Sequence, residues 1–213
     1  MKDFLPTELL AKIDAQRISR GFMSVTNLLE ILGSEENIVL DPFSTLVSSD
    51  VRIGSGNIFY PNVIVETHNA GTITVGNNNI FFPGTLLLAD GGKIVIGDGN
   101  EFGDGGVSIK ANMAEALIAI GNKGRYMHGP EIMGQCHLNS GTQIIGPIRV
   151  QNCNLGAGDS YKEPDPETRG GLLKGFGVAR NLTVYQGQVI NGNGNFEQSR
   201  VEQQSAYHPK KAY

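Results

Sequence analysis

The 213-residue sequence has little of what several protein classes require. It holds only two cysteines, Cys136 and Cys153, and they form no Cys-x-x-Cys motif. We expect reduced thiols that pack as small hydrophobic side chains in a cytoplasmic protein. No apolar run approaches the ~18 residues of a membrane span, and the first residues lack the hydrophobic core of a signal peptide. We therefore expect no membrane span and a cytoplasmic location.

Clustered positive charge is also scarce. The net charge is −4, and the only adjacent basic pair, Lys210–Lys211, lies in the terminal segment. Nucleic-acid binding proteins usually carry a basic patch or stripe, so we expect no nucleic-acid partner. Hydrophobic residues make up 39% of the chain, which is enough for one substantial core.

What the sequence does contain is a period of six residues. A bulky side chain recurs at this spacing through Ile120, Tyr126, Ile132, Leu138, Ile144 and Val150. A helix repeats every 3.6 residues and an ordinary strand every 2, so neither produces this series. Three six-residue units can close one triangular coil, and stacked coils enclose a continuous apolar interior. The period therefore predicts a β solenoid.

The same unit recurs upstream, with insertions between coils. Segments 53–57, 75–79 and 96–100 each begin with an aliphatic residue and glycine and end with asparagine, and a fourth begins at Ile120. We expect glycine and asparagine to supply the corners that need a positive φ. An aromatic residue stands six positions after each aliphatic one, and we predict that these residues stack in one inward column. They are Phe59, Phe81, Phe102 and Tyr126.

The spacing also predicts the other inward positions. The third inward residue of each coil falls at Val65, Leu87, Ser108 and Ile132. Extra residues follow this position in three coils, and we expect corner loops at 66–74, 88–95 and 109–119, where loops can carry function. Leu40 and Leu46 are expected to open the first coil. A last regular series is Leu172, Val178, Val184, Ile190 and Phe196.

Three parts follow along the chain: a helical N-terminal cap (1–37), a β-helix of about seven coils (38–196) and a polar C-terminal tail (197–213). The cap contains an apolar stripe, with Ser24 as N-cap and Gly33 as the stop. A solenoid needs its open end covered, so this helix either caps the first coil or binds a partner. The stripe consists of Val25, Leu28, Leu29 and Leu32.

Residues 159–171 form the longest interruption of the repeat. The segment is charged and contains two prolines. Such a loop on a rigid prism is a candidate lid or partner contact. It is equally compatible with a tolerated surface insertion.

Repeated Ile-Gly-x-x-x-x units resemble the hexapeptide-repeat superfamily, over about residues 40–196. The resemblance implies an all-β solenoid of the left-handed parallel β-helix type, a homotrimer, and often acyl transfer from acetyl-CoA or another acyl-CoA. The stretch 90–100 is similar to the γ-carbonic-anhydrase-like branch, which includes a small hexapeptide subunit of dynactin. A shared fold does not by itself imply a shared activity.

The zinc site of the γ-carbonic anhydrases tests that likeness. The family pattern uses three histidines, and its alignment with this sequence places Ile109, His128 and Met133 at the ligand positions. Catalytic zinc needs three protein ligands and one open position. Lys110 offers no free lone pair when protonated. We therefore expect no metal and no carbonic anhydrase activity.

Three histidines are candidate catalytic residues. In acyltransferases of the superfamily one histidine is the general base, and His128 is the first candidate because we expect it to project from the middle of a flat face. His137 is expected at a corner, and His68 lies in the first loop beside Glu66. An ordinary solvated histidine explains each equally simply. Arg180, in a weak match to the family's CoA-binding turn, could contact a phosphate.

The sequence therefore leaves three functions open. The first is a CoA-dependent acyl transfer to a small hydroxyl or amine acceptor. The second is a non-enzymatic scaffold or binding subunit, with a small molecule or a protein as partner. The third is a carbonic-anhydrase-like protein without its zinc site. The acceptor itself is not readable from the sequence.

Overall fold

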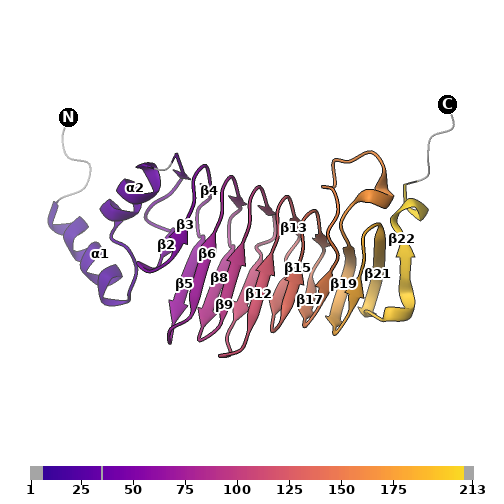
Figure 1. Cartoon of the computed structure of the whole chain (residues 1–213). Helices are drawn as coiled ribbons and strands as arrows, with labels where there is room; N and C mark the ends of the chain where they lie inside the picture. The colour runs from indigo at the N-terminus through magenta and orange to yellow at the C-terminus, as the bar shows by residue number, and fades with distance from the viewer. Residues whose placement is uncertain (1–6, 35, 209–213) are drawn as a thin grey trace.

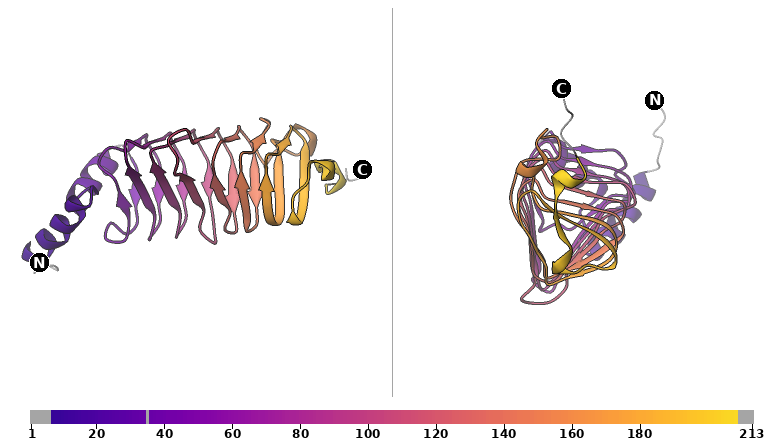
Figure 2. Two further views of the ribbon diagram at one scale, coloured as in Figure 1. Left: turned by 90° about the horizontal axis from the view of Figure 1, so that it is seen from below. Right: turned by 90° about the vertical axis from the view of Figure 1, so that its right-hand side faces the viewer.

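A computed structural model describes residues 7–34 and 36–208, and the fold is a parallel β-helix (Figure 1). Viewed along its axis, the prism has a roughly triangular section (Figure 2). We name its three sides face A, face B and face C; the chain enters on face B with β1 and then passes faces C, A and B in turn. Face A is a separate sheet of seven parallel strands, which agrees with the expected number of coils. Faces B and C are joined into one sheet of 15 strands by the last two coils.

Each face is a ladder of short strands, one from each coil. Face A holds β3 (Arg52–Ile53), β6 (Thr72–Val75), β9 (Lys93–Ile96), β12 (Leu117–Ile120), β15 (Cys136–Leu138), β18 (Asn154–Leu155) and β20 (Thr183–Val184). Face B holds β1 (Ile38–Val39), β4 (Ile58–Phe59), β7 (Ile80–Phe81), β10 (Glu101–Phe102), β13 (Arg125–Met127) and β16 (Gln143–Ile145). Face C holds β2 (Leu46–Val47), β5 (Ile64–His68), β8 (Leu86–Asp90), β11 (Ser108–Ala111), β14 (Glu131–Met133) and β17 (Ile148–Gln151). The long strands β19 (Leu172–Arg180) and β21 (Gln188–Asn195) run from face B onto face C.

The predicted aromatic column is confirmed. The four rings are fully buried, and they stack with centroids 5.0, 5.0 and 5.3 Å apart, at interplanar angles of 15°, 2° and 19°. All six residues of the regular series 120–150 are likewise buried. Strand register places each ring directly above the preceding one, because parallel neighbours pair residue for residue.

Several predicted inward residues are wrong by one position. Ile109, not Ser108, is paired with Leu87 and buried, because one extra residue at the corner, with Gly105 and Gly106 both at positive φ, shifts the register. At the ends of the solenoid, neighbouring residues take the predicted places in the same way. Val39 and Val47 replace Leu40 and Leu46, and Leu173 and Ala179 replace Leu172 and Val178. In the last series, Val184, Ile190 and Phe196 are buried as predicted.

The expected corner loops are largely strand. In segments 66–74, 88–95 and 109–119 the strands of faces C and A extend toward each other and meet in short turns. The extension adds buried side chains, including Ala89, Ala111 and Ile94, so the extra residues widen the core of these coils. Only the turn that contains Met113, which is 69% exposed, protrudes as a loop.

Asparagine has a second role that we did not predict. Asn57, Asn79 and Asn100 point into the core and are fully buried. Each Oδ1 accepts hydrogen bonds from the backbone N–H, the side-chain amide, or both, of the next coil, at 2.7 to 3.0 Å. The ladder starts at Asn37 and ends at Gly124, where a side chain would collide with the hydroxyl of Tyr126.

Both ends of the solenoid are covered. Ser24 is the N-cap of helix α2 (Val25–Ser34), and its hydroxyl accepts the N–H of Asn27 at 3.0 Å. The helix buries Leu28 and Leu32 against the first coil. Leu29 of the predicted stripe is 46% exposed. Helix α1 (Thr7–Ser19) extends beyond the solenoid (Figure 2) and is held by buried Arg17, which donates to the carbonyls of Met23, Pro42 and Thr45.

The C-terminal tail is better ordered than its composition indicated. After η2 (Gln198–Arg200), strand β22 (Val201–Gln203) pairs antiparallel with β21, and η3 (Gln204–Ala206) follows. Gln204 is 1% exposed and donates to the carbonyl of Gly170 at 2.8 Å. This antiparallel strand covers the last parallel edge, which a solenoid must protect. Residues 209–213 of the predicted tail lie outside the described residues.

We predict that Phe81→Ala lowers the free energy of unfolding by about 3–5 kcal/mol, because it opens a cavity in the middle of the aromatic column. Phe176→Ala is the matched control, since Phe176 is 53% exposed, and it should change stability by no more than about 0.5 kcal/mol. Equal losses for the two variants in urea unfolding would contradict the inward column.

Candidate functional site at the edge between faces B and C

The candidate residues lie in separate parts of the prism. His68 ends β5, where the chain turns from face C to face A, and His137 lies within β15 on face A. His128 lies between β13 and β14, where face B turns into face C. Arg180 ends β19 on face C. The structure therefore brings no two of the three histidines together.

The predicted positions of His128 and His137 are exchanged. His128 occupies a corner in the left-handed region, at φ 66°, and not the middle of a face. His137 is the exposed middle residue of a strand, between buried Cys136 and Leu138. The left-handed region is uncommon for a residue other than glycine and often marks a functional position.

A carboxylate from the preceding coil faces His128. The Nδ1 atom of His128 lies 3.3 Å from Oδ1 of Asp104, and the two side chains are 55% and 64% exposed. The backbone N–H of His128 also donates to the carbonyl of Asp104 at 2.7 Å. Asp104 reaches this place because Gly105 and Gly106 widen its corner by one residue. A Cβ at Gly105 would lie 3.1–3.2 Å from the backbone of His128 and Gly129.

This pair places a carboxylate beside one ring nitrogen of an exposed histidine. Proton abstraction by histidine can use such an arrangement when the carboxylate orients the ring and the second nitrogen meets the substrate. The 3.3 Å contact joins two solvent-exposed side chains.

An apolar slot of about 290 Å³ borders the histidine corner along face C. Its walls are mostly glycine, proline and aliphatic residues, with one carboxylate and one guanidinium at the rim. The lining residues are Gly129, Glu131, Pro147, Ile148, Arg149, Gly177 and Val178. Gly129 directly follows His128, so the slot begins next to this corner, while the imidazole itself faces Asp104 of the preceding coil.

Charged residues on face C set the electrostatics of the slot. Glu131 accepts from Nζ of Lys110 at 3.1 Å and from Nε of Arg149 at 2.8 Å. Burial alone would raise the pKa of Glu131, but these two cations outweigh it and lower the pKa. Two cations around one carboxylate leave a net positive charge, and the exposed Arg149 can still meet an anion.

Arg180 lies farther along the same face. Its Nε donates to Oε1 of Gln151 at 3.0 Å, and strand register places it beyond Gln151 in the column that contains Lys110 and Met133. Its place in that column puts it on the face that carries the slot. The predicted phosphate contact of Arg180 stays a prediction.

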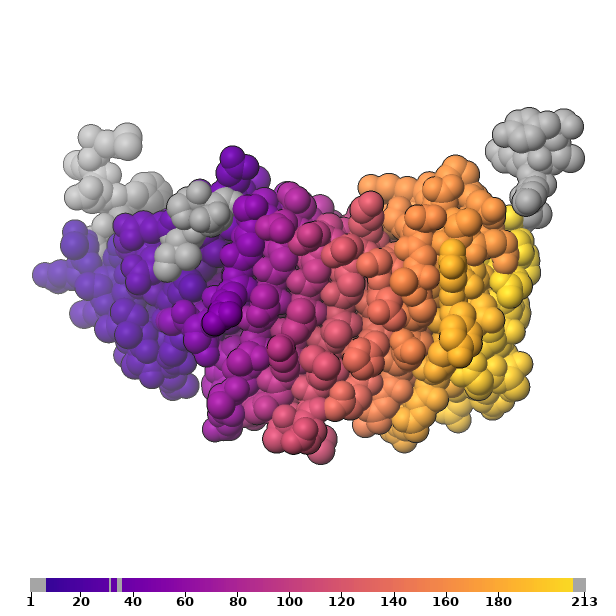
Figure 3. Space-filling model, in the orientation of Figure 1, coloured from indigo at the N-terminus to yellow at the C-terminus, as the bar shows by residue number. Residues whose placement is uncertain are grey.

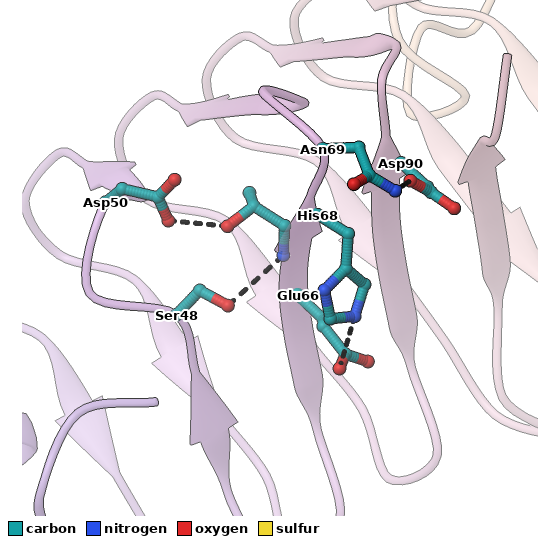
Figure 4. Close-up of polar contacts among 7 residues, drawn as sticks. Ser48, Asp50, Glu66, His68, Asn69 and Asp90 are labelled. Carbon is teal, nitrogen blue, oxygen red and sulfur yellow. Dashed lines mark hydrogen bonds and ion pairs between the residues drawn. The ribbon is translucent and has the colours of Figure 1, made fainter. Parts of the chain in front are cut away.

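His68 has a carboxylate partner at the edge between faces C and A. Its Nε2 lies 2.8 Å from Oε1 of Glu66, and nearby Asn69 donates to Asp90 at 2.7 Å (Figure 4). The hydroxyl of Thr67 donates to Asp50, and its N–H to Ser48. The contacts of Asn69 and Thr67 join neighbouring coils, whereas the His68–Glu66 pair lies within one strand. Together they account for the polar residues of this corner without a ligand.

The expected ligand positions of a zinc site are not arranged for one. Ile109 is fully buried inside the solenoid, and the register pairs Met133 with Lys110 instead. Among residues 7–34 and 36–208, no group of three histidine, cysteine, aspartate or glutamate residues is placed to hold a metal ion. The expectation of no metal remains a prediction.

Asp104 and Arg149 are the residues that sequence reasoning missed. Asp104 stood in the aligned segment 102–109, but the six-residue register assigned it no partner. The usable signal was the pair Gly105–Gly106, because two adjacent glycines can add one residue to a corner. Arg149 is visible only as the outward neighbour of Val150, and its position beside Glu131 on the preceding coil depends on strand register.

The two cysteines behave as core residues. Both are free and buried on adjacent rungs of face A. Burial raises the pKa of Cys136 to about 11 and raises the pKa of Cys153. The reactive thiolate is therefore scarce at neutral pH.

We predict that iodoacetamide at pH 8 modifies neither cysteine of the folded protein, because the thiols are protonated and shielded from solvent. Intact-mass spectrometry should show two added groups only after unfolding in guanidinium chloride. Rapid modification of the native protein would contradict the buried positions.

Comparison with known protein-family models and with curated proteins found no match for this chain. Within the part of the chain that the structure describes, no helix has the length and apolarity for a membrane crossing. The resemblance to hexapeptide-repeat proteins therefore rests on the repeat motif, and the parallel β-helix agrees with it.

Proposed function

We propose that the protein is an acyltransferase of the hexapeptide-repeat type, with His128 as general base. The observation that carries the proposal is the Asp104–His128 pair at an open corner. The adjoining apolar slot supports it by offering a place for an acyl group or a thioester arm. The donor that the resemblance implies is acetyl-CoA or another acyl-CoA.

The proposed step gives His128 and Asp104 separate roles. Nε2 of His128 takes the proton from the acceptor hydroxyl or amine as its oxygen or nitrogen bonds to the thioester carbonyl carbon. The carbon–sulfur bond breaks, and the departing CoA thiolate receives the proton from the imidazolium. Asp104 stabilises the charged imidazolium and fixes its orientation. Atoms and charges balance, with free CoA and the acylated acceptor as products.

Positive charge near the slot suits a CoA donor. Arg149 borders the slot and is 58% exposed, and Arg180 lies on the same face. Guanidinium groups bind phosphate in bidentate geometry. We assign these two residues to the phosphate groups of the donor, with Arg149 nearer the reacting carbon.

A scaffold is the second candidate, and outward apolar residues on face B favour it. Tyr60 and Phe82 stack on the outer surface with centroids 5.0 Å apart. Ordered apolar columns on a flat sheet suit packing against another protein. One column consists of Ile38, Ile58 and Ile80. The other consists of Leu40, Tyr60 and Phe82.

We predict that His128→Asn lowers kcat of acyl transfer from acetyl-CoA about 10²–10⁴-fold, because the amide cannot act as a base. Asparagine tolerates the left-handed backbone at this corner, so the fold should be kept. Asp104→Asn should cause a smaller loss. The assay follows release of free CoA with a panel of small hydroxyl and amine acceptors.

His137→Asn is the matched control, since it removes an imidazole that is also exposed but lies on face A, and its activity should equal that of the unaltered protein. Turnover that survives His128→Asn would refute the assigned base. No CoA release with any acceptor, together with no binding of acetyl-CoA by calorimetry, would favour the scaffold.

We further propose a homotrimer, because the apolar columns on face B need a covering partner and the family resemblance implies three-fold assembly. Light scattering at micromolar concentration should give three times the chain mass. The double variant Ile58→Asp and Phe82→Asp should be a monomer, because it places charges in the covered surface. A monomeric unaltered protein would contradict this assembly.

A further inference from the structure

The insertion 159–171 forms a groove at a second edge of the prism, between faces A and B. The insertion is the orange segment before β19 that rises above the neighbouring coils in Figure 1. In Figure 3 it protrudes from the adjacent surface. Because His128 lies at the edge between faces B and C, the insertion does not cover it. The groove therefore needs its own explanation.

Two adjoining hollows make up this groove. One, of about 320 Å³, is lined by Gly99, Glu101, Lys123, Gly124, Ser160, Tyr161 and Lys162. The other, of about 330 Å³, is lined by Asn122, Lys123, Ser140, Gly158, Asp159, Ser160 and Glu163. They share Lys123 and Ser160, so they lie side by side between the insertion and the edge of the solenoid.

The insertion is fastened at several points, so the groove is preformed. The hydroxyl of Tyr161 donates to Glu101 at 3.1 Å, three coils away from the strand β19 that follows the insertion. Arg169 donates to the carbonyl of Glu163 at 2.7 Å, and Gln186 donates to the carbonyl of Thr168 at 3.0 Å. A ligand would therefore not have to order this segment when it binds.

Lys123 occupies a backbone position that disfavours it. It lies at φ 56° in the column of left-handed corners between faces A and B. The other coils fill this position with Gly56, Asn78, Gly99 and Gly141. A lysine here is strained relative to glycine, and such strain is typical of functional positions. Its Cγ lies 3.8 Å from the point that a Cβ on Gly99 would occupy, so the chain leans into the first hollow.

The first hollow is rich in positive charge. Arg125 lies with its guanidinium carbon 4.5 Å from the ring centre of Tyr161, and Nζ of Lys162 lies 5.4 Å from it. Glu101 is already engaged by Tyr161 and lies 3.9 Å from Nε of Arg125. Within the described chain, Lys123 and Lys162 take part in no salt bridge. Two ammonium groups are therefore available to an anion.

The second hollow is more acidic, although Lys123 borders it as well. Its walls carry the side chains of Asp159, Glu163, Asn122 and Ser140. The Oδ1 of Asn122 and the Oγ of Ser140 already accept backbone N–H groups, from Asp98 and Asn122. The amide N–H groups of Asn122 and the hydroxyl proton of Ser140 can donate to the hydroxyls of a ligand, and the two carboxylates can accept from them. Because the two hollows adjoin at Lys123 and Ser160, a ligand that extends from one into the other would meet both the ammonium groups and these polar groups.

We propose that this groove binds a sugar phosphate or a similar phosphorylated polyol. Lys123 and Lys162 hold the phosphate, and Asp159, Glu163 and Asn122 hold the hydroxyl groups. The ring of Tyr161 lines the phosphate end, and Lys123 and Ser160 border both ends. This site is separate from the proposed transfer site. Phosphate binding explains why a lysine occupies a left-handed corner.

Calorimetric titration of the full-length protein with glucose 6-phosphate tests the proposal. We expect saturable binding with one ligand per chain, weakened about tenfold or more by Lys123→Gly and by Lys162→Gln, which remove charge-assisted hydrogen bonds. Lys93→Gln, an exposed lysine on face A, is the matched control and should bind normally. Glycine suits the left-handed backbone, so Lys123→Gly should unfold at an equal or higher temperature while it binds more weakly.

Two further ligands separate the ends of the groove. Inorganic phosphate should bind more weakly than glucose 6-phosphate, and glucitol more weakly still. Equal affinity for inorganic phosphate would overturn the assignment of the hydroxyl-binding end. Absence of saturable binding, or binding that both lysine variants leave unchanged, would overturn the site itself.

Discussion

The structure depends on one constraint, which is that equivalent residues of successive coils lie directly above one another at the strand spacing of ~4.8 Å. A side chain in the core must therefore suit its own copy in the next coil. Aromatic rings meet this demand by stacking, with centroids 5.0 to 5.3 Å apart. Buried asparagines meet it by hydrogen bonding, since each amide both donates and accepts along the axis. Both ladders end near Tyr126, whose buried hydroxyl lies 3.0 Å from Thr142.

The same constraint separates stability from function. Side-chain ladders fill the interior, so successive coils differ in sequence and length mainly at the outer surfaces, and above all at the edges. The three edges differ in what their added residues do. One extra residue at Gly105–Gly106 brings Asp104 to His128, and the insertion 159–171 builds a groove over Lys123. At the third edge, longer strands add core residues such as Ala89 and Ala111. Changes at the first two edges leave the ladders intact, which is why the proposed sites can be altered without unfolding the protein.

The fold was predictable because a six-residue period has one structural meaning, and the series from Ile120 to Val150 carries it without interruption. The predicted register was wrong where a corner changed length. The inward positions were assigned to Ser108 and Leu172, whereas the structure places Ile109 and Leu173 there. Edge geometry was predictable only in part. His128 was identified as a histidine outside the core, but its left-handed corner and its partner Asp104 depend on an inserted residue. The C-terminal strand was missed because its polar residues give no periodic signal, and it forms only against the last coil.

The central functional claim is that the corner at His128 is where acyl transfer takes place. The most direct test is a crystal structure of the protein with acetyl-CoA. The account predicts that the thioester lies within hydrogen-bonding reach of a substrate held at Nε2 of His128, with the pantetheine arm along the slot beside Gly129 and Ile148 and the phosphates toward Arg149. Acetyl-CoA bound at another edge, or pointing its thioester away from His128, would contradict it.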